Sequence, residues 1–122
     1  MEQRLVIIFS DNDDILPGLA EALKQHDVDF ARFSRAEGSI KDFELISDNY
    51  EDISKISDVY VVDKISGRAL KQKDGHTINL HFTLIRKDAG KTLPFSGELK
   101  KGLAAGDLTI VLTLTDMKKI IH

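Results

Sequence analysis

The sequence contains no cysteine, and this absence excludes several kinds of chemistry at once. Without cysteine the chain forms no disulfides, offers no thiolate nucleophile and builds no sulfur-ligated zinc site. The absence also fits a reducing compartment. Any metal ligand in this chain would have to be His, Asp, Glu or Asn.

Long hydrophobic runs are missing as well. A membrane-spanning helix needs about 18 or more consecutive apolar residues, whereas the first ten residues hold only the five-residue run Leu5–Phe9. That run is also too short, and too polar in its surroundings, for the apolar region of a signal peptide. We therefore expect no membrane segment and a cytoplasmic protein.

An excess of positive charge is the third missing feature. The chain has 17 Lys and Arg against 20 Asp and Glu, which gives a formal net charge of −3. Because DNA binding through the phosphate backbone normally needs a broad basic surface, this balance disfavours direct contact with DNA. Three local basic clusters remain, and we interpret them as solvated side chains in loops or near the chain end. They are Arg68, Lys71 and Lys73; Lys100 and Lys101; and Lys118 and Lys119.

The residues that are present are typical of one globular domain. The chain has 122 residues, of which 42% are hydrophobic and 30% charged, and it shows no internal repeat, low-complexity stretch or linker. We expect a single domain over residues 1–122, with its core over about residues 4–115.

One segment predicts a helix. Leu16, Leu19 and Leu23 recur at helical spacing, and Asp14 is a suitable N-cap before them. The neighbouring carboxylates suit the positive end of a helix, and the spaced ligands of a calcium loop are absent. The residues around Ser47–Ser57 fit either a short helix or a loop.

The remaining periodic segments predict strands. A buried strand is expected over Arg4–Phe9, and period-two alternation predicts a strand on each side of Gly38. The other expected strands are Val59–Leu70, Thr77–Ile85, Leu93–Leu99 and Leu108–Thr115. The prediction is an α+β fold, a mainly antiparallel sheet of about seven strands with one main helix packed on it. We expect structural turns or bends at Gly38, Gly67 and Gly97, and at Gly38 a positive φ, a bulge or a close backbone approach.

Polar groups interrupt this otherwise apolar β pattern between Gly75 and Val111. In the strand Thr77–Ile85 the apolar side chains face one way, while His81 lies on the opposite, polar face. Glu98 lies on the polar face of the next strand. A functional site is one explanation for polar side chains at these positions. Three other histidines need no functional role: His76 is expected in a wet turn, His26 at the helix end and His122 at the chain end.

The last strand also carries a second face that is rich in threonine and partly apolar. A sheet of about seven strands with a single helix leaves apolar surface uncovered, and such surface usually indicates association. A homo-oligomer is therefore expected.

The order of these segments resembles the "plants and prokaryotes conserved" (PPC) domain. The resemblance covers about residues 4–115. It rests on the Gly38–Ser39 joint, the Ser66–Gly67 pair after a strand, the Leu80–His81 strand and the hairpin return at Gly97 and Leu99. It implies a compact α+β domain that forms homotrimers around a three-fold axis.

The same resemblance bears on DNA. Plant members accompany AT-hook segments, and free-standing prokaryotic members often carry the label putative DNA-binding protein. This chain has no Arg-Gly-Arg-Pro hook, so a partner protein would make any DNA contact.

Many prokaryotic members have a His-x-His and a Gly-Gly-His-Leu that together can hold a metal. The corresponding segments here are NLH and SGEL, so Asn79, His81 and Glu98 stand at these positions and two of the three histidines are lost. Imidazole, carboxylate and amide groups can still bind a divalent ion such as zinc. We favour a hydrogen-bonded polar cluster, in which His81 donates to Glu98, over an occupied zinc site.

Three functions remain open. The leading one is a homotrimeric binding or regulatory module with a polar pocket, lined by Asn79, His81 and Glu98, at or near the subunit boundary. The second is a DNA-associated regulatory protein that acts through a partner. The third, a small metal-dependent enzyme, is disfavoured because no nucleophile accompanies His81 and Glu98 in a recognised arrangement and no phosphate-binding loop is present.

Overall fold

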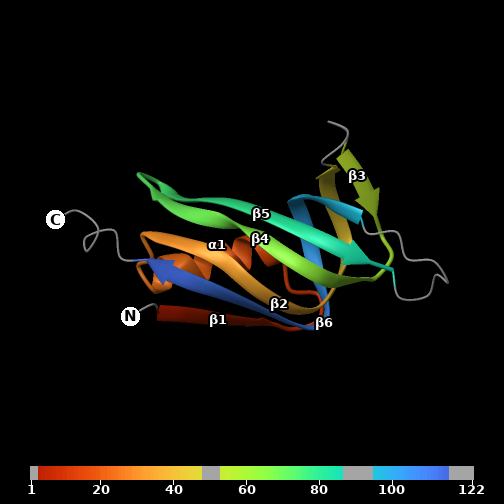
Figure 1. Ribbon diagram of the computed structural model, residues 1–122, viewed down its shortest axis with the longest axis horizontal. Coiled ribbons are helices and arrows are strands. Elements are labelled where there is room, and N and C mark those ends of the chain that lie inside the picture. Colours follow the sequence, from red (N-terminus) through yellow and green to blue (C-terminus); the bar gives the residue numbers. More distant parts are fainter. Residues whose placement is uncertain (1–2, 48–52, 87–94, 116–122) are drawn as a thin grey trace.

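The computed structural model describes residues 3–47, 53–86 and 95–115, and within these ranges the chain forms one helix and six strands (Figure 1). The prediction of a mainly antiparallel α+β fold with one helix is confirmed, although the strand count is six rather than seven. The elements are β1 Gln3–Phe9, α1 Ile15–Gln25, β2 Phe30–Ser47, β3 Ile53–Ile56, β4 Tyr60–Gln72, β5 Gly75–Ile85 and β6 Phe95–Thr115.

The sheet closes on itself. Its strand order is β1-β6-β5-β4-β2-β3, and an additional pairing of β6 with β2 joins the two sides into a barrel. Every strand pairing is antiparallel. The first part of β6 pairs with β5, its last part pairs with β1, and β2 pairs with it along most of its length. One long strand therefore pairs with three of the other strands of the barrel.

The expected turn at Gly38 is wrong, because this glycine lies inside β2. It has a φ of +132°, and the register between β2 and β6 shifts between Glu37 and Ser39. A Cβ at this position would lie 2.5 Å from the carbonyl oxygen of Asp107 on β6. The glycine thus permits a bulge and a close backbone approach, and the chain continues as one 18-residue strand.

Gly67 and Gly97 lie inside strands, in agreement with the expected strands Val59–Leu70 and Leu93–Leu99, and neither forms a turn. Gly67 belongs to β4, has a φ of +114° and approaches the backbone of Asn79. Gly97 belongs to β6, where a Cβ would lie 2.4 Å from the carbonyl oxygen of Ile46. Both positions mark close contacts between neighbouring strands, for which glycine is needed.

The core lies between the helix and the inner face of the barrel. Ile15, Leu19 and Leu23 of α1 are fully buried, which confirms the predicted helix face, although Leu16 is only half-buried. Burying each such side chain contributes about 1.5–3 kcal/mol to folding. The sheet residues at the centre of this core are Leu80, Phe82, Leu84, Leu108, Ile110 and Leu112.

The helix ends agree with the sequence interpretation. Asp14 is the N-cap residue with extended backbone, although its side chain makes no capping hydrogen bond, and His26 is the C-cap residue. Within the described ranges, no helix has the length and apolar character that crossing a bilayer requires.

The region between β2 and β4 contributes β3, which pairs with β2, and so part of the segment expected as a helix or loop is a strand. The predicted positions Lys118, Lys119 and His122, and the start of the strand expected from Leu93, lie outside the described residues.

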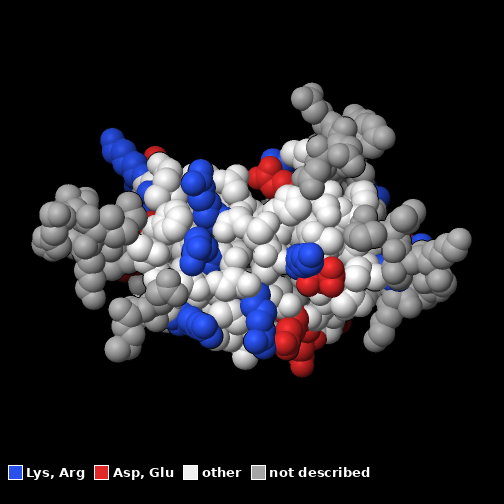
Figure 2. Space-filling model, in the orientation of Figure 1, with Lys and Arg blue, Asp and Glu red and all other residues white. Residues whose placement is uncertain are grey.

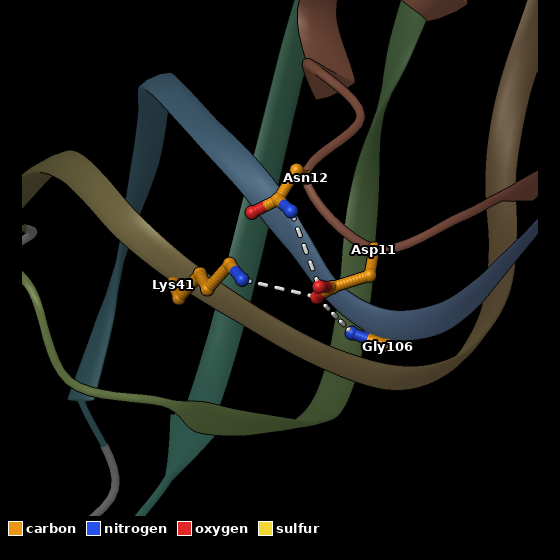
Figure 3. A network of polar contacts seen from close by, with 4 residues as sticks. All are labelled: Asp11, Asn12, Lys41 and Gly106. Carbon is orange, nitrogen blue, oxygen red and sulfur yellow. Dashed lines mark hydrogen bonds and ion pairs between the residues drawn. The ribbon is translucent and has the colours of Figure 1, made fainter.

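A polar network ties the loop after β1 to the rest of the barrel (Figure 3). Oδ1 of Asp11 accepts hydrogen bonds from Nζ of Lys41 on β2, at 3.0 Å, and from the backbone N–H of Gly106 on β6, at 2.8 Å. Nδ2 of Asn12 donates to Oδ2 of Asp11 at 3.2 Å. The Gly106 N–H, and then the Lys41 ammonium, lower the pKa of Asp11 below the ordinary carboxyl value.

We predict that Gly67→Ala destabilises the fold more than Gly75→Ala does. Both glycines have positive φ, but a Cβ at Gly67 would lie 1.9 Å from the carbonyl oxygen of Asn79, whereas none lies within 4 Å at Gly75. The difference between the two losses of unfolding free energy isolates the steric contact. We expect Gly67→Ala to lose about 1–3 kcal/mol more than Gly75→Ala. Urea unfolding of the two variants measures it, and equal losses would contradict the assigned close approach.

A second prediction concerns Asp11→Asn. Because the pKa of Asp11 is lower in the folded than in the unfolded chain, the carboxylate stabilises the fold above the unfolded pKa of about 3.9, and this contribution disappears as the pH falls through the folded value. The difference in urea midpoint between the parent protein and the variant should be constant from about pH 7 to pH 5 and shrink below about pH 4.

The control for this experiment is Asp74→Asn, in the exposed turn between β4 and β5. It should leave the pH profile unchanged. A gap between parent and Asp11→Asn that persists undiminished at the lowest pH would contradict the ionic role of Asp11.

Candidate functional site

The predicted site residues lie together on the outer face of the barrel. Asn79 and His81 are on β5 and Glu98 is on β6, and His81 stands directly opposite Glu98 in the strand register. Leu80 and Phe82, which alternate with them, are fully buried. The division of β5 into a core face and a polar face is therefore confirmed.

One hydrogen bond joins two of these three residues, which together we call the polar row. Nδ2 of Asn79 donates to Oε1 of Glu98 at 3.0 Å. Glu98 and His81 are half-buried and Asn79 is exposed, so the row is open to a ligand. The expected donation from His81 to Glu98 stays a prediction. The polar face continues beyond His81, where Oγ of Ser96 donates to Oγ1 of Thr83 at 3.1 Å.

The polar row does not fit zinc. In the part of the chain that the structure describes, no group of three or more His, Cys, Asp or Glu residues could hold a metal ion. The row offers one imidazole and one carboxylate, and Asn79 turns its amide nitrogen toward that carboxylate. Protein zinc sites use at least three strong ligands, so a single chain supports the hydrogen-bonded cluster rather than the metal site.

His76 differs from its expected place in a wet turn. It lies within β5, is half-buried, and places Nε2 2.6 Å from the carbonyl oxygen of Val28. Because a carbonyl only accepts, Nε2 donates this bond and joins β5 to the segment between α1 and β2. The sequence could have indicated this placement, since His76 alternates in phase with Ile78 and Leu80 and therefore lies on the inward face of the strand.

Most of the basic residues differ from their predicted loop positions. Arg68 and Lys71 lie in β4, and Lys100 and Lys101 lie in β6, whereas Lys73 lies in the turn after β4, as expected. Nζ of Lys71 is 2.6 Å from Oδ1 of Asp27, and this contact raises the pKa of Lys71. Lys71 is therefore neutralised locally rather than being part of a basic patch.

An arrangement that the sequence interpretation missed crosses the sheet on the same outer face. Arg68 of β4 stands opposite Arg32 of β2, Arg32 stands opposite Thr113 of β6, and Thr113 stands opposite Arg4 of β1. We call Arg4, Arg32 and Arg68 the arginine row. Its members are far apart in the sequence, and only the register between strands brings them together.

Apolar side chains are exposed beside this row. Val6 and Ile8 of β1 are 55% and 69% exposed, and Val111 of β6 stands opposite Val6. We call Val6, Ile8 and Val111 the β1 patch. Thr109, opposite Ile8, extends the partly apolar face that the sequence predicted for the last strand.

The comparisons with known proteins agree with this fold. The sequence matches the family model of the Plants and Prokaryotes Conserved (PCC) domain over residues 1–116. Comparison with curated proteins gives no match.

Several solved structures are similar. A plant- and prokaryote-conserved (PPC) protein from Pyrococcus horikoshii has 12% identity and a TM-score of 0.75, covering 93% of this chain and 80% of that one. A "putative DNA binding protein" from Bacteroides thetaiotaomicron has 17% identity and a TM-score of 0.78, covering 93% and 78%. A "metal-containing protein" from Archaeoglobus fulgidus has 15% identity and a TM-score of 0.73, covering 93% and 80%.

At these identities the solved structures show a shared fold and nothing about a shared ligand. The family match rests on the sequence itself and spans nearly all of it. The chain belongs to the Plants and Prokaryotes Conserved (PCC) domain family.

Proposed function

We propose that the protein is a homotrimeric binding module whose polar row forms part of a ligand site at or near a subunit boundary. The observation that carries the proposal is the convergence of an amide, an imidazole and a carboxylate on one outer face, fixed by the bond from Asn79 to Glu98. Three different hydrogen-bonding groups at adjacent positions suit a small polar ligand.

The chemistry of the row supports recognition of a ligand that both donates and accepts hydrogen bonds. Oε1 of Glu98 is held by Asn79, which orients the carboxylate so that its other oxygen can accept from a ligand. The His81 imidazole can donate or accept, depending on its tautomer. Because ligand sites are normally concave, we assign the opposite wall of this site to a second copy of the chain.

The β1 patch supports self-association. β1 is an edge strand that pairs with β6 alone among the described strands, and Val6 and Ile8 are largely exposed on it. Exposed β-branched side chains on an edge strand favour association unless something covers them. A second copy of this chain is the occupant that we propose, and the family resemblance implies three copies.

A role in association with DNA is a second candidate. The similar protein from Bacteroides thetaiotaomicron is described as a putative DNA-binding protein, and the exposed arginine row is the feature of this chain that favours the same role. The net charge of −3 weighs against an extended contact with a DNA backbone.

Native mass spectrometry of the parent protein and of His81→Ala tests the proposed site. We expect a three-chain species for both, with a copurifying small molecule retained by the parent protein after chelator treatment and lost from the variant. The loss follows because His81 supplies one of the groups that contact the ligand. Thr83→Ala, on the same face beyond His81, is the control and should retain the molecule.

Two outcomes would count against this assignment. Identical bound masses in the parent and His81→Ala spectra would exclude a ligand site at His81. Added zinc retained at one ion per chain by the parent and lost from the variant would identify a metal site instead of the polar site proposed here.

A separate prediction concerns the subunit contact. Ile8→Lys should convert the three-chain assembly to single chains, because it would bury a charge in the proposed interface. Light scattering after gel filtration measures the mass, and circular dichroism checks that the chain stays folded. Thr77→Lys, exposed on β5 away from the β1 patch, should leave the mass unchanged. An Ile8→Lys protein with the parental mass would place the contact elsewhere.

A further inference from the structure

The arginine row occupies one line across the outer face of the barrel. From β5 to β1, the residues opposite one another in the strand register are Asn79, Arg68, Arg32, Thr113 and Arg4. Figure 2 shows this face, on which Lys and Arg side chains form a line across the left half, while the main groups of Asp and Glu lie to its right.

The three arginine side chains point away from the core. Residues next to them in each strand face inward and are buried, as for Phe33 beside Arg32 and Ala69 beside Arg68, whereas Arg4, Arg32 and Arg68 are exposed. Side chains directly opposite each other in an antiparallel sheet share a face. The Cα atoms of Arg32 and Arg68 are therefore about 5 Å apart, and Arg4 lies about 10 Å beyond Arg32.

The electrostatics of this row are unfavourable without a counterion. Like charges directly opposite one another destabilise a pair of strands, and within residues 3–47, 53–86 and 95–115 none of the three arginines forms an ion pair. Other basic residues have carboxylate partners, among them Arg35 with Glu37 and Lys71 with Asp27. An acidic chain thus leaves three guanidinium groups unneutralised in one line.

The surrounding groups are hydrogen-bond donors. Oγ of Ser34, on β2, is hydrogen-bonded to Oγ1 of Thr113, which lies between Arg32 and Arg4 in the row. Thr113 is buried and Ser34 is exposed, so when Thr113 donates this bond the hydrogen of the Ser34 hydroxyl can be donated to a ligand. Each guanidinium presents a planar fork of N–H groups that matches two oxygens of a phosphate.

We propose that the arginine row binds an oligophosphate chain, either free or as part of a nucleotide. Arg32 and Arg68 are close enough to hold the same or consecutive phosphates, and Arg4 reaches the far end of the chain. Three arginines per chain supply fewer contacts than a duplex footprint of about six to ten phosphates, so we assign the row to an oligophosphate. This inference goes beyond the ligand site proposed above, because Arg4, Arg32 and Arg68 are not members of the polar row, although Asn79 of that row stands opposite Arg68.

The test is isothermal titration calorimetry with inorganic tripolyphosphate at low salt and again at about 0.15 M salt. We expect the parent protein to bind and Arg32→Gln or Arg68→Gln to weaken the affinity about tenfold or more, as loss of a charge-assisted hydrogen bond predicts. The affinity of Arg68→Lys should lie between those of the parent protein and Arg68→Gln, because lysine keeps the charge but lacks the planar fork of N–H groups.

The matched control is Arg35→Gln, on the same strand and face as Arg32 but paired with Glu37. It should bind like the parent protein. Thermal unfolding without ligand separates binding from folding, because Arg68→Gln removes a like-charge contact and should be at least as stable as the parent. His81→Ala should also retain the affinity for tripolyphosphate. Failure of this proposal can therefore be distinguished from failure of the ligand site proposed at the polar row.

A parallel titration with ATP distinguishes the two sources of the phosphate chain. Equal affinities for ATP and tripolyphosphate would show that the phosphates alone are recognised, and tighter binding of ATP would identify a nucleotide. The proposal is overturned if tripolyphosphate does not bind, if Arg35→Gln loses as much affinity as Arg32→Gln, or if an oligonucleotide duplex binds where tripolyphosphate does not.

Discussion

The structure depends on the double pairing of β6. This single strand of 21 residues pairs with β5 at its start, with β1 at its end and with β2 along most of its length. Without the pairing between β6 and β2 the sheet would be open. Closure requires backbones to approach closely, and Gly38 and Gly97 permit this approach because a side chain at either position would meet a carbonyl oxygen.

Closure also determines which polar side chains meet on the outside. Residues opposite one another in the register share a face, so each outward row combines residues from several strands. The polar row joins neighbours connected by one hairpin, β5 and β6. The arginine row instead joins β1, β2 and β4, whose residues are brought together by the long-range pairing that closes the barrel.

This difference between local and long-range pairing explains why the sequence predicted the polar row but not the arginine row. Periodicity is a local property, so it predicted the buried face of α1, the two faces of β5 and the position of His81 and Glu98 on the polar faces of neighbouring strands. At Gly38 it correctly indicated a positive φ or a bulge but wrongly divided β2 into two strands, because a glycine between two alternating segments fits a turn and a bulge equally well. It included Arg68 in the expected strand Val59–Leu70 but could not set it opposite Arg32, since that register depends on pairings between distant segments.

The β1 patch and the arginine row adjoin on the outer face of β1, because Val6 follows Arg4 by two residues on the same face. An assembly that covers Val6 and Ile8 would bring the arginine rows close to the subunit boundary. The positive charge of neighbouring chains would then add up, at a cost that a bound polyanion offsets. Anion binding and subunit association should therefore be thermodynamically linked, since a ligand that binds the assembled state more tightly also stabilises it.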